Sequence, residues 1–181
     1  MKYVVTGGAG FIGSHITKKL VERGDIVTVI DNMNTGKEKN LESVIDKINF
    51  VKGDILDTEL LEGITKDADG VFHQAALASV QDSFDEPDEY HNVNVNGTEN
   101  ILKLSKKYGF KVVYASSSSV YGNPIRIPIK ESDEKNPINP YAETKLKKEG
   151  LAIEYSKMGV SVIGLRYFNV FGKGQSKEYA G

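Results

Sequence analysis

The sequence of 181 residues contains no cysteine, and this absence excludes disulfide bonds, thiolate metal ligands and a cysteine nucleophile. Histidine is scarce as well. The three histidines, His15, His73 and His91, lie too far apart along the chain to show the spacing of metal ligands. We therefore expect no metal site.

Long hydrophobic runs are also absent, since no apolar stretch approaches the roughly 20 residues needed to span a bilayer. The 23 lysines and arginines are nearly balanced by 25 aspartates and glutamates, so the formal net charge is −2 and no basic surface for nucleic acid or acidic membranes is expected. The first residues enter a strand-like run without a secretion signal. The sequence predicts a soluble, cytoplasmic protein that binds neither nucleic acid nor membrane.

Hydrophobic residues make up 39% of the chain and charged residues 27%, which is the ordinary balance of a globular domain. Short β-branched runs alternate with longer amphipathic stretches. The runs expected to be strands are 2–6, 25–30, 48–54, 69–75, 111–116 and 160–166. Several are almost continuously apolar, which is typical of parallel strands covered on both faces. The alternation predicts an α/β fold with a doubly wound parallel sheet, and its longest helices are expected near 89–108 and 139–158.

The segment TGGAGFIGS follows the first strand and opens the first helix. Gly8, Gly10 and Gly13 fit the pattern G-x-G-x-x-G, and Gly7, Gly10 and Gly13 fit G-x-x-G-x-x-G. Glycine permits a tight turn, a close approach of the backbone to a pyrophosphate and tight packing of the helix on the strand. Free N–H groups at the start of the helix would receive the phosphates. Because strand, loop, helix and second strand follow in order, the motif predicts a dinucleotide site.

Two carboxylates end the second and third strand-like runs. Asp31 follows the last glycine of the motif by 18 residues, where a carboxylate can accept the ribose hydroxyls of adenosine and repel a 2′-phosphate. This spacing favours NAD over NADP, and a cap of the following turn is the alternative. For Asp54 two interpretations stay open, a contact with adenine and an N-cap of the next helix.

Tyr141 and Lys145 stand four residues apart in PYAETK, so they share one face of a helix. A tyrosine with a pKa of about 10 is a poor base at neutral pH. A nearby ammonium and a cationic nicotinamide would stabilise its phenolate and lower that pKa. Such a pair alone is usually a chance surface pair. Here it follows a dinucleotide motif and the fifth strand, which favours a catalytic tyrosine.

A series of motifs follows along the chain: TGGAGFIGS, Asp31, GDILD, HQAALASV, NVNGT, ASSSSVYG, PYAETK and LRYFNVFG. Together they resemble the extended short-chain dehydrogenase/reductase (NAD-dependent epimerase/dehydratase) family, and most closely its UDP-hexose 4-epimerases. The resemblance implies a Rossmann-type NAD-binding domain with the catalytic residues over 1–166. It also implies the start of a substrate-binding region over 167–181. Since family members continue with a smaller C-terminal domain, the chain is expected to be a truncated piece of a longer protein.

The resemblance further implies which residues contact NAD. The glycine loop and the helix start would lie over the pyrophosphate, the loop after the second strand would surround the adenosine ribose, and the segment after the fourth strand would line the cofactor. The implied residues are Gly7, Gly10, Phe11, Ile12, Gly13, Asp31, Asn32, Met33, Asn34, Thr35, Gly36, Asp54, Ile55, Gln74, Ala75, Ala76, Leu77, Ala78, Val93, Asn94, Tyr141, Lys145 and Phe168. His73 is expected to be a buried structural residue rather than a catalyst.

Catalytic and substrate-binding residues are implied in the same way. The catalytic Ser or Thr of the family stands five residues before the Gly of the Tyr-Gly pair, which gives Ser117. Tyr141 matches the family's base, and Lys145 matches the residue that binds the nicotinamide ribose. The implied substrate contacts are Ser79, Ser117, Tyr141 and Asn169.

The residues beside Ser117 bear on the reaction. Related 4,6-dehydratases carry an acidic pair directly after the catalytic residue, whereas this chain has Ser118 and Ser119, and Ser116 is expected to support the strand end. The resemblance therefore implies 4-epimerisation of a UDP-sugar, either UDP-glucose/UDP-galactose or an N-acetyl analogue. NAD would be a bound cofactor and Tyr141 the base. The alternatives are a UDP-glucuronate 4-epimerase, another sugar-nucleotide epimerase or dehydratase, and, in a different class, a non-catalytic NAD-binding regulator.

Family members often dimerise through a four-helix bundle built from two helices of each subunit. The long helices near 89–108 and 139–158 are the candidates here, so the resemblance implies a homodimer as a possible assembly.

Overall fold

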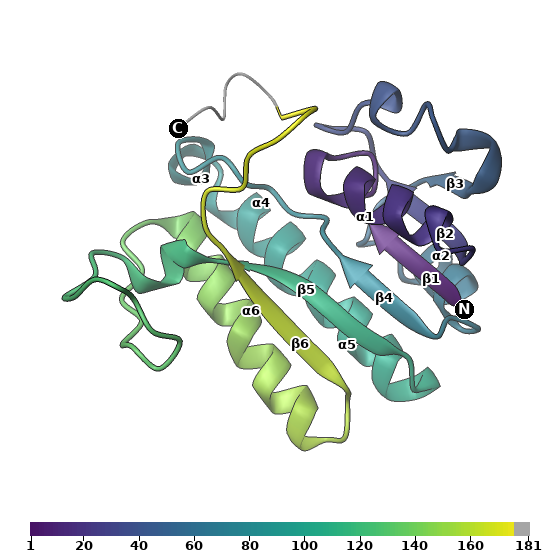
Figure 1. The fold of residues 1–181 in the computed structure, drawn as a ribbon. Coiled ribbons are helices and arrows are strands. Elements are labelled where there is room, and N and C mark those ends of the chain that lie inside the picture. Colours follow the sequence, from purple (N-terminus) through teal and green to yellow (C-terminus); the bar gives the residue numbers. More distant parts are fainter. Residues whose placement is uncertain (176–181) are drawn as a thin grey trace.

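A computed structural model describes residues 1–175, which form a six-stranded sheet between layers of helices (Figure 1). The strands are β1 (Lys2–Thr6), β2 (Ile26–Asp31), β3 (Asn49–Lys52), β4 (Gly70–His73), β5 (Lys111–Ser117) and β6 (Val162–Tyr167). Their order is β3-β2-β1-β4-β5-β6, and every neighbouring pair is parallel. The predicted doubly wound α/β sheet is confirmed.

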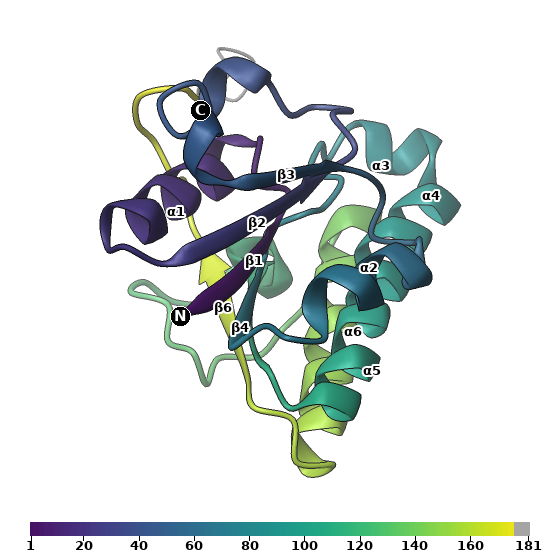
Figure 2. The ribbon, with the colours of Figure 1, turned by 90° about the vertical axis from the view of Figure 1, so that its right-hand side faces the viewer.

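Helices cover the two faces of this sheet unequally. They are α1 (Phe11–Glu22), α2 (Thr58–Thr65), α3 (Asp82–Asp85), α4 (Pro87–His91), α5 (Gly97–Tyr108) and α6 (Pro140–Lys157). Figure 2 shows α1 on one side of the sheet and α2, α5 and α6 on the other. None of the helices formed by residues 1–175 is long and apolar enough to cross a membrane.

The hydrophobic core consists of two layers, one on each face of the sheet. Val4 and Val5 are neighbours in β1 and are both buried, and because side chains alternate along a strand they belong to different layers. The Val4 layer includes Leu61 of α2 and Ile101 of α5. The Val5 layer includes Leu20 of α1. Burial on both faces explains why the strand sequences are almost continuously apolar.

Two strands are shorter than the sequence predicts. The runs 48–54 and 69–75 contain β3 and β4, but these strands end at Lys52 and His73. The following residues bend into loops at the carboxyl edge of the sheet, where Gly53 N donates to Asp31 O at 3.1 Å and Gln74 N donates to Thr6 O at 3.1 Å. The residues that leave the strands therefore build the rim of the sheet.

The helix expected near 89–108 is interrupted. After α4, residues Asn92–Asn96 form a π-helical turn before α5 begins at Gly97. A Cβ at Gly97 would lie 2.4 Å from Ile55 Cδ1, so glycine permits close packing of the helix against this residue. π-Helical turns often occur at functional sites, and this one turns the Asn94 side chain inward.

Helix α6 has a well-defined start. Asn139 is the N-cap, and its Oδ1 accepts a hydrogen bond from Ala142 N at 2.8 Å. Pro140 occupies the first turn, where its missing N–H costs no helical hydrogen bond. Tyr141 therefore lies in the first turn of the longest helix among the described residues.

Candidate active site

A groove with a cavity volume of about 220 Å³ crosses the carboxyl ends of the strands. It lies where β1 has β2 on one side and β4 on the other, which is the switch point at which α/β sheets bind ligands. The predicted cofactor residues that line the groove are Gly7, Gly10, Asp31, Asn32, Asn34, Thr35, Asp54, Ile55, Gln74, Ala75, Ala76, Leu77 and Val93. The structure thus brings together five segments that are separate in the sequence.

The glycine loop forms one end of the groove. Gly7 has a positive φ of 66°, and its N–H donates to Ile30 O at 2.8 Å, which ties the loop to β2. A Cβ at Gly13 would lie only 2.1 Å from Gly7 O, so this position requires glycine. Helix α1 begins after Gly10 without a side-chain cap. The first N–H groups of a helix have no partner within it, and here they offer donors to an anion. Phe11 and Ile12 supply two of them and are half-buried.

Asp31 is buried beside this loop. Its Oδ2 accepts a hydrogen bond from Ala9 N at 2.9 Å, and its Oδ1 accepts one from Met33 N at 2.9 Å. These bonds fix the carboxylate in the wall of the groove and leave further acceptor sites on both oxygens. Met33 has a positive φ of 65°, which is uncommon for a side chain of this type. A Cβ at Gly36 would meet Asp31 Oδ1 at 2.6 Å, so the loop folds tightly around the carboxylate.

Asp54 is not the N-cap of the following helix. That position belongs to Asp57, whose side chain accepts from Leu60 N at 3.0 Å. Asp54 instead accepts from Leu56 N at 2.9 Å and from the Asn32 side-chain amide at 3.0 Å. The N-cap interpretation of Asp54 is therefore wrong, and Asp54 lines the groove. Its hydrogen bond with Asn32 joins the loops that follow β2 and β3.

The segment after β4 forms the opposite wall, and Asn94 holds it in place. The Asn94 side chain is fully buried, with its Oδ1 accepting from Leu77 N at 2.9 Å and its Nδ2 donating to Leu77 O at 3.0 Å. The same Nδ2 donates to Thr144 Oγ1 at 3.1 Å. Asn94 therefore connects the wall of the groove with α6. Ala78 and Ser79 continue this wall outward, where Ser79 Oγ accepts from Asp82 N at 3.2 Å.

His73 is buried below this wall and has two hydroxyl partners. Thr98 Oγ1 donates to Asn94 O at 2.6 Å, so it must accept the hydrogen bond that joins it to His73 Nε2 at 3.0 Å. The proton of His73 then lies on Nε2, and Nδ1 accepts from Thr6 Oγ1 at 2.7 Å. Burial lowers the pKa of His73 well below its usual value. His73 is a neutral, structural residue, as the sequence predicts.

Ser117, Tyr141 and Lys145 meet at the carboxyl end of β5. Lys145 Nζ lies 5.3 Å from the centroid of the Tyr141 ring, and it donates to Ala115 O at 3.4 Å. Burial raises the pKa of the Tyr141 phenol, and an interaction with the Ser117 hydroxyl opposes this effect. Burial lowers the pKa of Lys145 to about 8. The three side chains predicted to be catalytic are thus neighbours in space.

The serine run changes conformation at Ser117. Ser117 is the last residue of β5, and Ser118–Tyr121 form a 3₁₀ turn. Ser117 Oγ accepts from Ser119 N at 3.1 Å and lies 2.9 Å from Ser119 Oγ. Ser118 and Ser119 therefore shape the turn beside Ser117 and place no carboxylate there.

Behind the strand end lies an ion pair that the sequence analysis missed. Arg166 of β6 donates to both carboxylate oxygens of Glu149, each at 2.8 Å, and Ser116 Oγ donates to Glu149 Oε1 at 2.6 Å. Burial alone would raise the pKa of Glu149, but the hydrogen bonds from Arg166 and Ser116 outweigh this effect and lower it. Ser116 supports the strand end, as predicted, and its partner is Glu149. The four-residue spacing between Lys145 and Glu149 places both on one face of α6, and this spacing is the signal in the sequence that could have identified Glu149.

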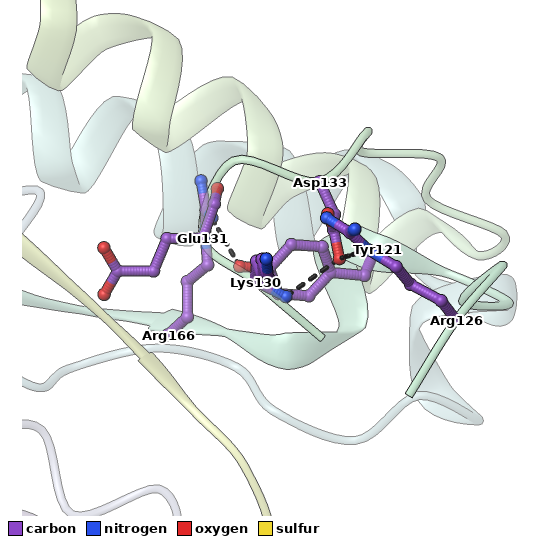
Figure 3. Close-up of polar contacts among 6 residues, drawn as sticks. All are labelled: Tyr121, Arg126, Lys130, Glu131, Asp133 and Arg166. Atoms are coloured by element: carbon purple, nitrogen blue, oxygen red, sulfur yellow. Dashed lines mark hydrogen bonds and ion pairs between the residues drawn. The ribbon is translucent and has the colours of Figure 1, made fainter. Parts of the chain in front are cut away.

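Arg166 also holds the loop between the strand of Ser117 and the helix of Tyr141. Its guanidinium donates to the Tyr121 hydroxyl at 2.6 Å and to Glu131 O at 2.9 Å (Figure 3). Within the loop, Arg126 pairs with Asp133. The loop encloses a second hollow of about 260 Å³ beside the Tyr121 ring. One arginine thereby connects β6, α6, the start of the loop at Tyr121 and its middle at Glu131.

Phe168 and Asn169, the remaining predicted contacts, follow β6 and are exposed. They lie at the carboxyl edge of the sheet but do not line the groove. Of the region 167–181 predicted to begin substrate binding, residues 176–181 lie outside the described part of the chain.

Comparisons with known proteins agree with this geometry. The sequence model of the NAD dependent epimerase/dehydratase family matches residues 3–181. The chain belongs to this family. The resemblance inferred from the motifs is thereby confirmed.

Relatives within the epimerase/dehydratase family include enzymes of two reaction types. The UDP-glucose 4-epimerase of Lactobacillus helveticus is 42% identical over 176 residues, which cover 95% of this chain and 52% of that protein. The UDP-N-acetylglucosamine 4-epimerase from Methanobrevibacter ruminantium M1, solved in complex with UDP-N-acetylmuramic acid, matches with a TM-score of 0.93 and 41% identity. The match covers 97% of this chain and 57% of that one. The dTDP-glucose 4,6-dehydratase from Streptomyces venezuelae, solved with NAD bound, has a TM-score of 0.94 at 33% identity and covers 98% of this chain and 59% of that one.

This family member spans little more than half the length of those relatives. The described residues carry the glycine loop, the groove and the tyrosine–lysine pair. The π-helical turn that carries Asn94 and the Glu149–Arg166 pair are the parts of the site that the sequence pattern did not reveal.

Proposed function

We propose that this chain is the cofactor-binding and catalytic part of an NAD-dependent UDP-sugar 4-epimerase. The observation that carries the proposal is the meeting of Ser117, Tyr141 and Lys145 at the carboxyl end of β5, in the same sheet whose carboxyl edge forms a groove suited to a dinucleotide. The named 4-epimerases among its relatives support it.

The groove fits NAD by shape and by donor chemistry. The glycine loop excludes a side chain where a Cβ at Gly13 would overlap Gly7 O, and the start of α1 offers N–H donors for a pyrophosphate. Asp31 would accept the ribose hydroxyls of adenosine, and its charge would disfavour a 2′-phosphate. Ile55 and Val93 would provide apolar contacts in the same groove. When bound, NAD would supply the hydride acceptor and donor for oxidation of the sugar at C4 and reduction from its opposite face.

In the proposed reaction Tyr141 exchanges a proton with the oxygen on C4 of the sugar. Its phenol must lose a proton to act as a base, and burial opposes this loss. The ammonium of Lys145 and the hydroxyl of Ser117 favour the phenolate, because a positive charge and a hydrogen-bond donor both stabilise an anion. Ser117 would also donate to the sugar oxygen or relay the proton to Tyr141.

Epimerisation is favoured over dehydration by the residues that follow Ser117. Elimination of water from the sugar needs one protein group that removes a proton from a carbon and another that protonates the hydroxyl leaving the next carbon. Ser118 and Ser119 provide neither an acid nor a base for this purpose. Ser118 and Ser119 instead begin a 3₁₀ turn, which is capped by Ser117 Oγ accepting from Ser119 N. A dehydratase is the second candidate, because the fold is similar to that of the Streptomyces 4,6-dehydratase.

The proposed substrate is UDP-glucose/UDP-galactose or an N-acetyl analogue, and UDP-glucuronate is the alternative. A non-catalytic NAD-binding regulator would have no need for Ser117, Tyr141 and Lys145 together, so their proximity favours an enzyme.

A homodimer formed through α5 and α6 also belongs to the proposal. It would cover Ile153 and Met158 of the α6 region, which are exposed, and sedimentation of the protein would test it.

The deciding experiment is an incubation of the protein, expressed at the full length of its gene, with UDP-glucose, UDP-N-acetylglucosamine and UDP-glucuronate. Separation of the epimeric products by chromatography would identify the substrate. A 4-keto-6-deoxy product would instead indicate a dehydratase, and NAD binding without any product would indicate a regulator. The 181-residue chain alone is expected to bind NAD but to epimerise poorly, because it spans little more than half of the relatives.

A further inference from the structure

Lys148 is a buried amine that has no role in the proposed reaction. It lies on α6, three residues after Lys145, and its side chain is completely inaccessible to solvent. Its Nζ has no hydrogen-bond partner among residues 1–175. It lies 5.5 Å from the centroid of the Tyr114 ring on β5. A lysine in such a place is rare, because lysine is almost never fully buried unless it is paired.

The surroundings of Lys148 contain positive or neutral groups and no free carboxylate. On α6 the charge that acts on Lys148 is that of Lys145, and on β4 the titratable neighbour is His73, which is neutral. The Tyr114 phenol on β5 has its pKa raised by burial and by Glu149, so it is also neutral. Glu149 directs its carboxylate to Arg166 and Ser116 instead. No anion among the described residues is available to balance a charge on Lys148.

Two ammonium groups cannot both be stable in this layer, the buried space between α6 and β5. An unpaired charge in a protein interior costs far more than a neutral amine, so a buried lysine without an acceptor loses its proton. Lys145 retains an acceptor, because its Nζ donates to Ala115 O, and it faces the Tyr141 ring. Lys148 has a comparable ring contact, with Tyr114, but no hydrogen-bond acceptor among the described residues. Of the two amines, Lys145 is therefore the one that keeps a proton.

We propose that Lys148 is held as an uncharged amine beneath the site, so that Lys145 is the single ammonium of this layer. Lys148 would then be a positioning residue, which fills the space between α6 and the sheet without competing with the charge beside Tyr141. Its influence on Tyr141 rests on the proposed function, whereas its own protonation state does not. The low pKa expected for Lys148 from burial and from Lys145 agrees with the geometry.

The proposal has a measurable consequence for unfolding. In the unfolded chain Lys148 would regain a pKa of about 10.4 and take up a proton at neutral pH. A base whose pKa is lowered by folding makes the folded state more stable as pH rises towards the pKa of the unfolded chain. This one extra proton should appear as a steeper dependence of the unfolding constant on pH.

The test compares the 181-residue chain with Lys148→Met and with Lys147→Met, which alters the exposed neighbour on the same helix. Between pH 7 and pH 9 the unfolding constant of the unsubstituted chain should fall about tenfold more per pH unit than that of Lys148→Met. Lys147→Met should follow the unsubstituted chain. Lys145 titrates in all three proteins, so its contribution cancels in the comparison.

Carbon-13 NMR of the lysine ε-carbons provides a second readout that does not depend on a stable variant. In the unsubstituted chain, one lysine should stay neutral at pH 7 while Lys145 is still protonated, and the signal of the neutral lysine should be missing from Lys148→Met. In Lys145→Met the Lys148 signal should titrate at higher pH, because a neighbouring charge is gone. Equal pH dependence of Lys148→Met and the unsubstituted chain, or ordinary titration of every lysine except Lys145, would overturn the proposal. Neither measurement uses NAD or a sugar, so its failure would leave the proposed epimerase untouched.

Discussion

The guanidinium of Arg166 and the carboxylate of Glu149 are joined by two hydrogen bonds of 2.8 Å, with side chains only 20% and 11% exposed. This pair lies directly behind Ser116, the residue before the proposed catalytic serine. Breaking a buried pair leaves the other charge without a partner, which is a large cost. The pair therefore stabilises the end of β5 where the reaction is proposed to occur.

Replacing Glu149 by glutamine should lower the free energy of unfolding by about 3 kcal/mol at pH 7, because Arg166 loses its counter-ion. The pKa of Glu149 is lowered by folding, so its contribution is present above the unfolded pKa of about 4.3 and is lost as pH falls further. Denaturant unfolding at pH 7 and pH 3 measures both effects. Glu143→Gln, an exposed change on the same helix, is the control. An equal loss at both pH values would contradict the assignment.

Tyr141→Phe should abolish turnover in the full-length protein, by about 100-fold or more, because the variant has no hydroxyl to exchange a proton. NAD affinity should stay nearly unchanged, since the ring still fills its place beside Lys145. Product assays and a binding titration separate the two effects. Tyr155→Phe on the same helix removes a hydroxyl that faces Glu99, away from the site, and should keep its activity. Activity of Tyr141→Phe close to that of the unsubstituted protein would exclude Tyr141 as the base.

Asp31→Asn should weaken NAD binding by about 10–100-fold, because hydrogen bonds to a charged acceptor contribute roughly 1.5–3 kcal/mol. The same change removes the repulsion of a 2′-phosphate, so the preference for NAD over NADP should shrink. Calorimetric titration with both cofactors measures the two quantities. Asp46→Asn, an exposed residue on a separate turn, should alter neither. An unchanged ratio of the two affinities would show that Asp31 does not face the adenosine ribose.

Gly13→Ala should destabilise the chain by about 3 kcal/mol or more and weaken cofactor binding, because its Cβ would overlap Gly7 O at 2.1 Å. The matched control is Gly63→Ala in α2. A Cβ there meets nothing within 4 Å, so alanine should stabilise the helix by up to about 1 kcal/mol. Thermal unfolding of both variants distinguishes a steric requirement from a general effect of glycine. Tolerance of Gly13→Ala would mean that the glycine loop is more open than described.

The sequence predicted the parts of this molecule that depend on local pattern. Apolar runs identified the six strands, and the glycine spacing identified the groove, because each follows from residues close together in the chain. The proximity of Ser117 to Tyr141 came from the family resemblance, since 24 residues separate them. The π-helical turn at Asn94 and the Arg166–Glu149 pair were missed. Both depend on partners from other elements, and no spacing in one segment reveals those partners.

The capped start of α6 has a consequence for the whole active centre. Tyr141, Lys145, Lys148 and Glu149 are all carried by this one helix, and each residue along a helix turns the next side chain by about 100°. The angular phase of all four groups is therefore set within two residues of Tyr141, by the Asn139 cap and by Pro140. An insertion of one residue between Pro140 and Tyr141 would rotate all four side chains by about 100° about the helix axis, so that the phenol, the amines and the carboxylate would leave their partners together.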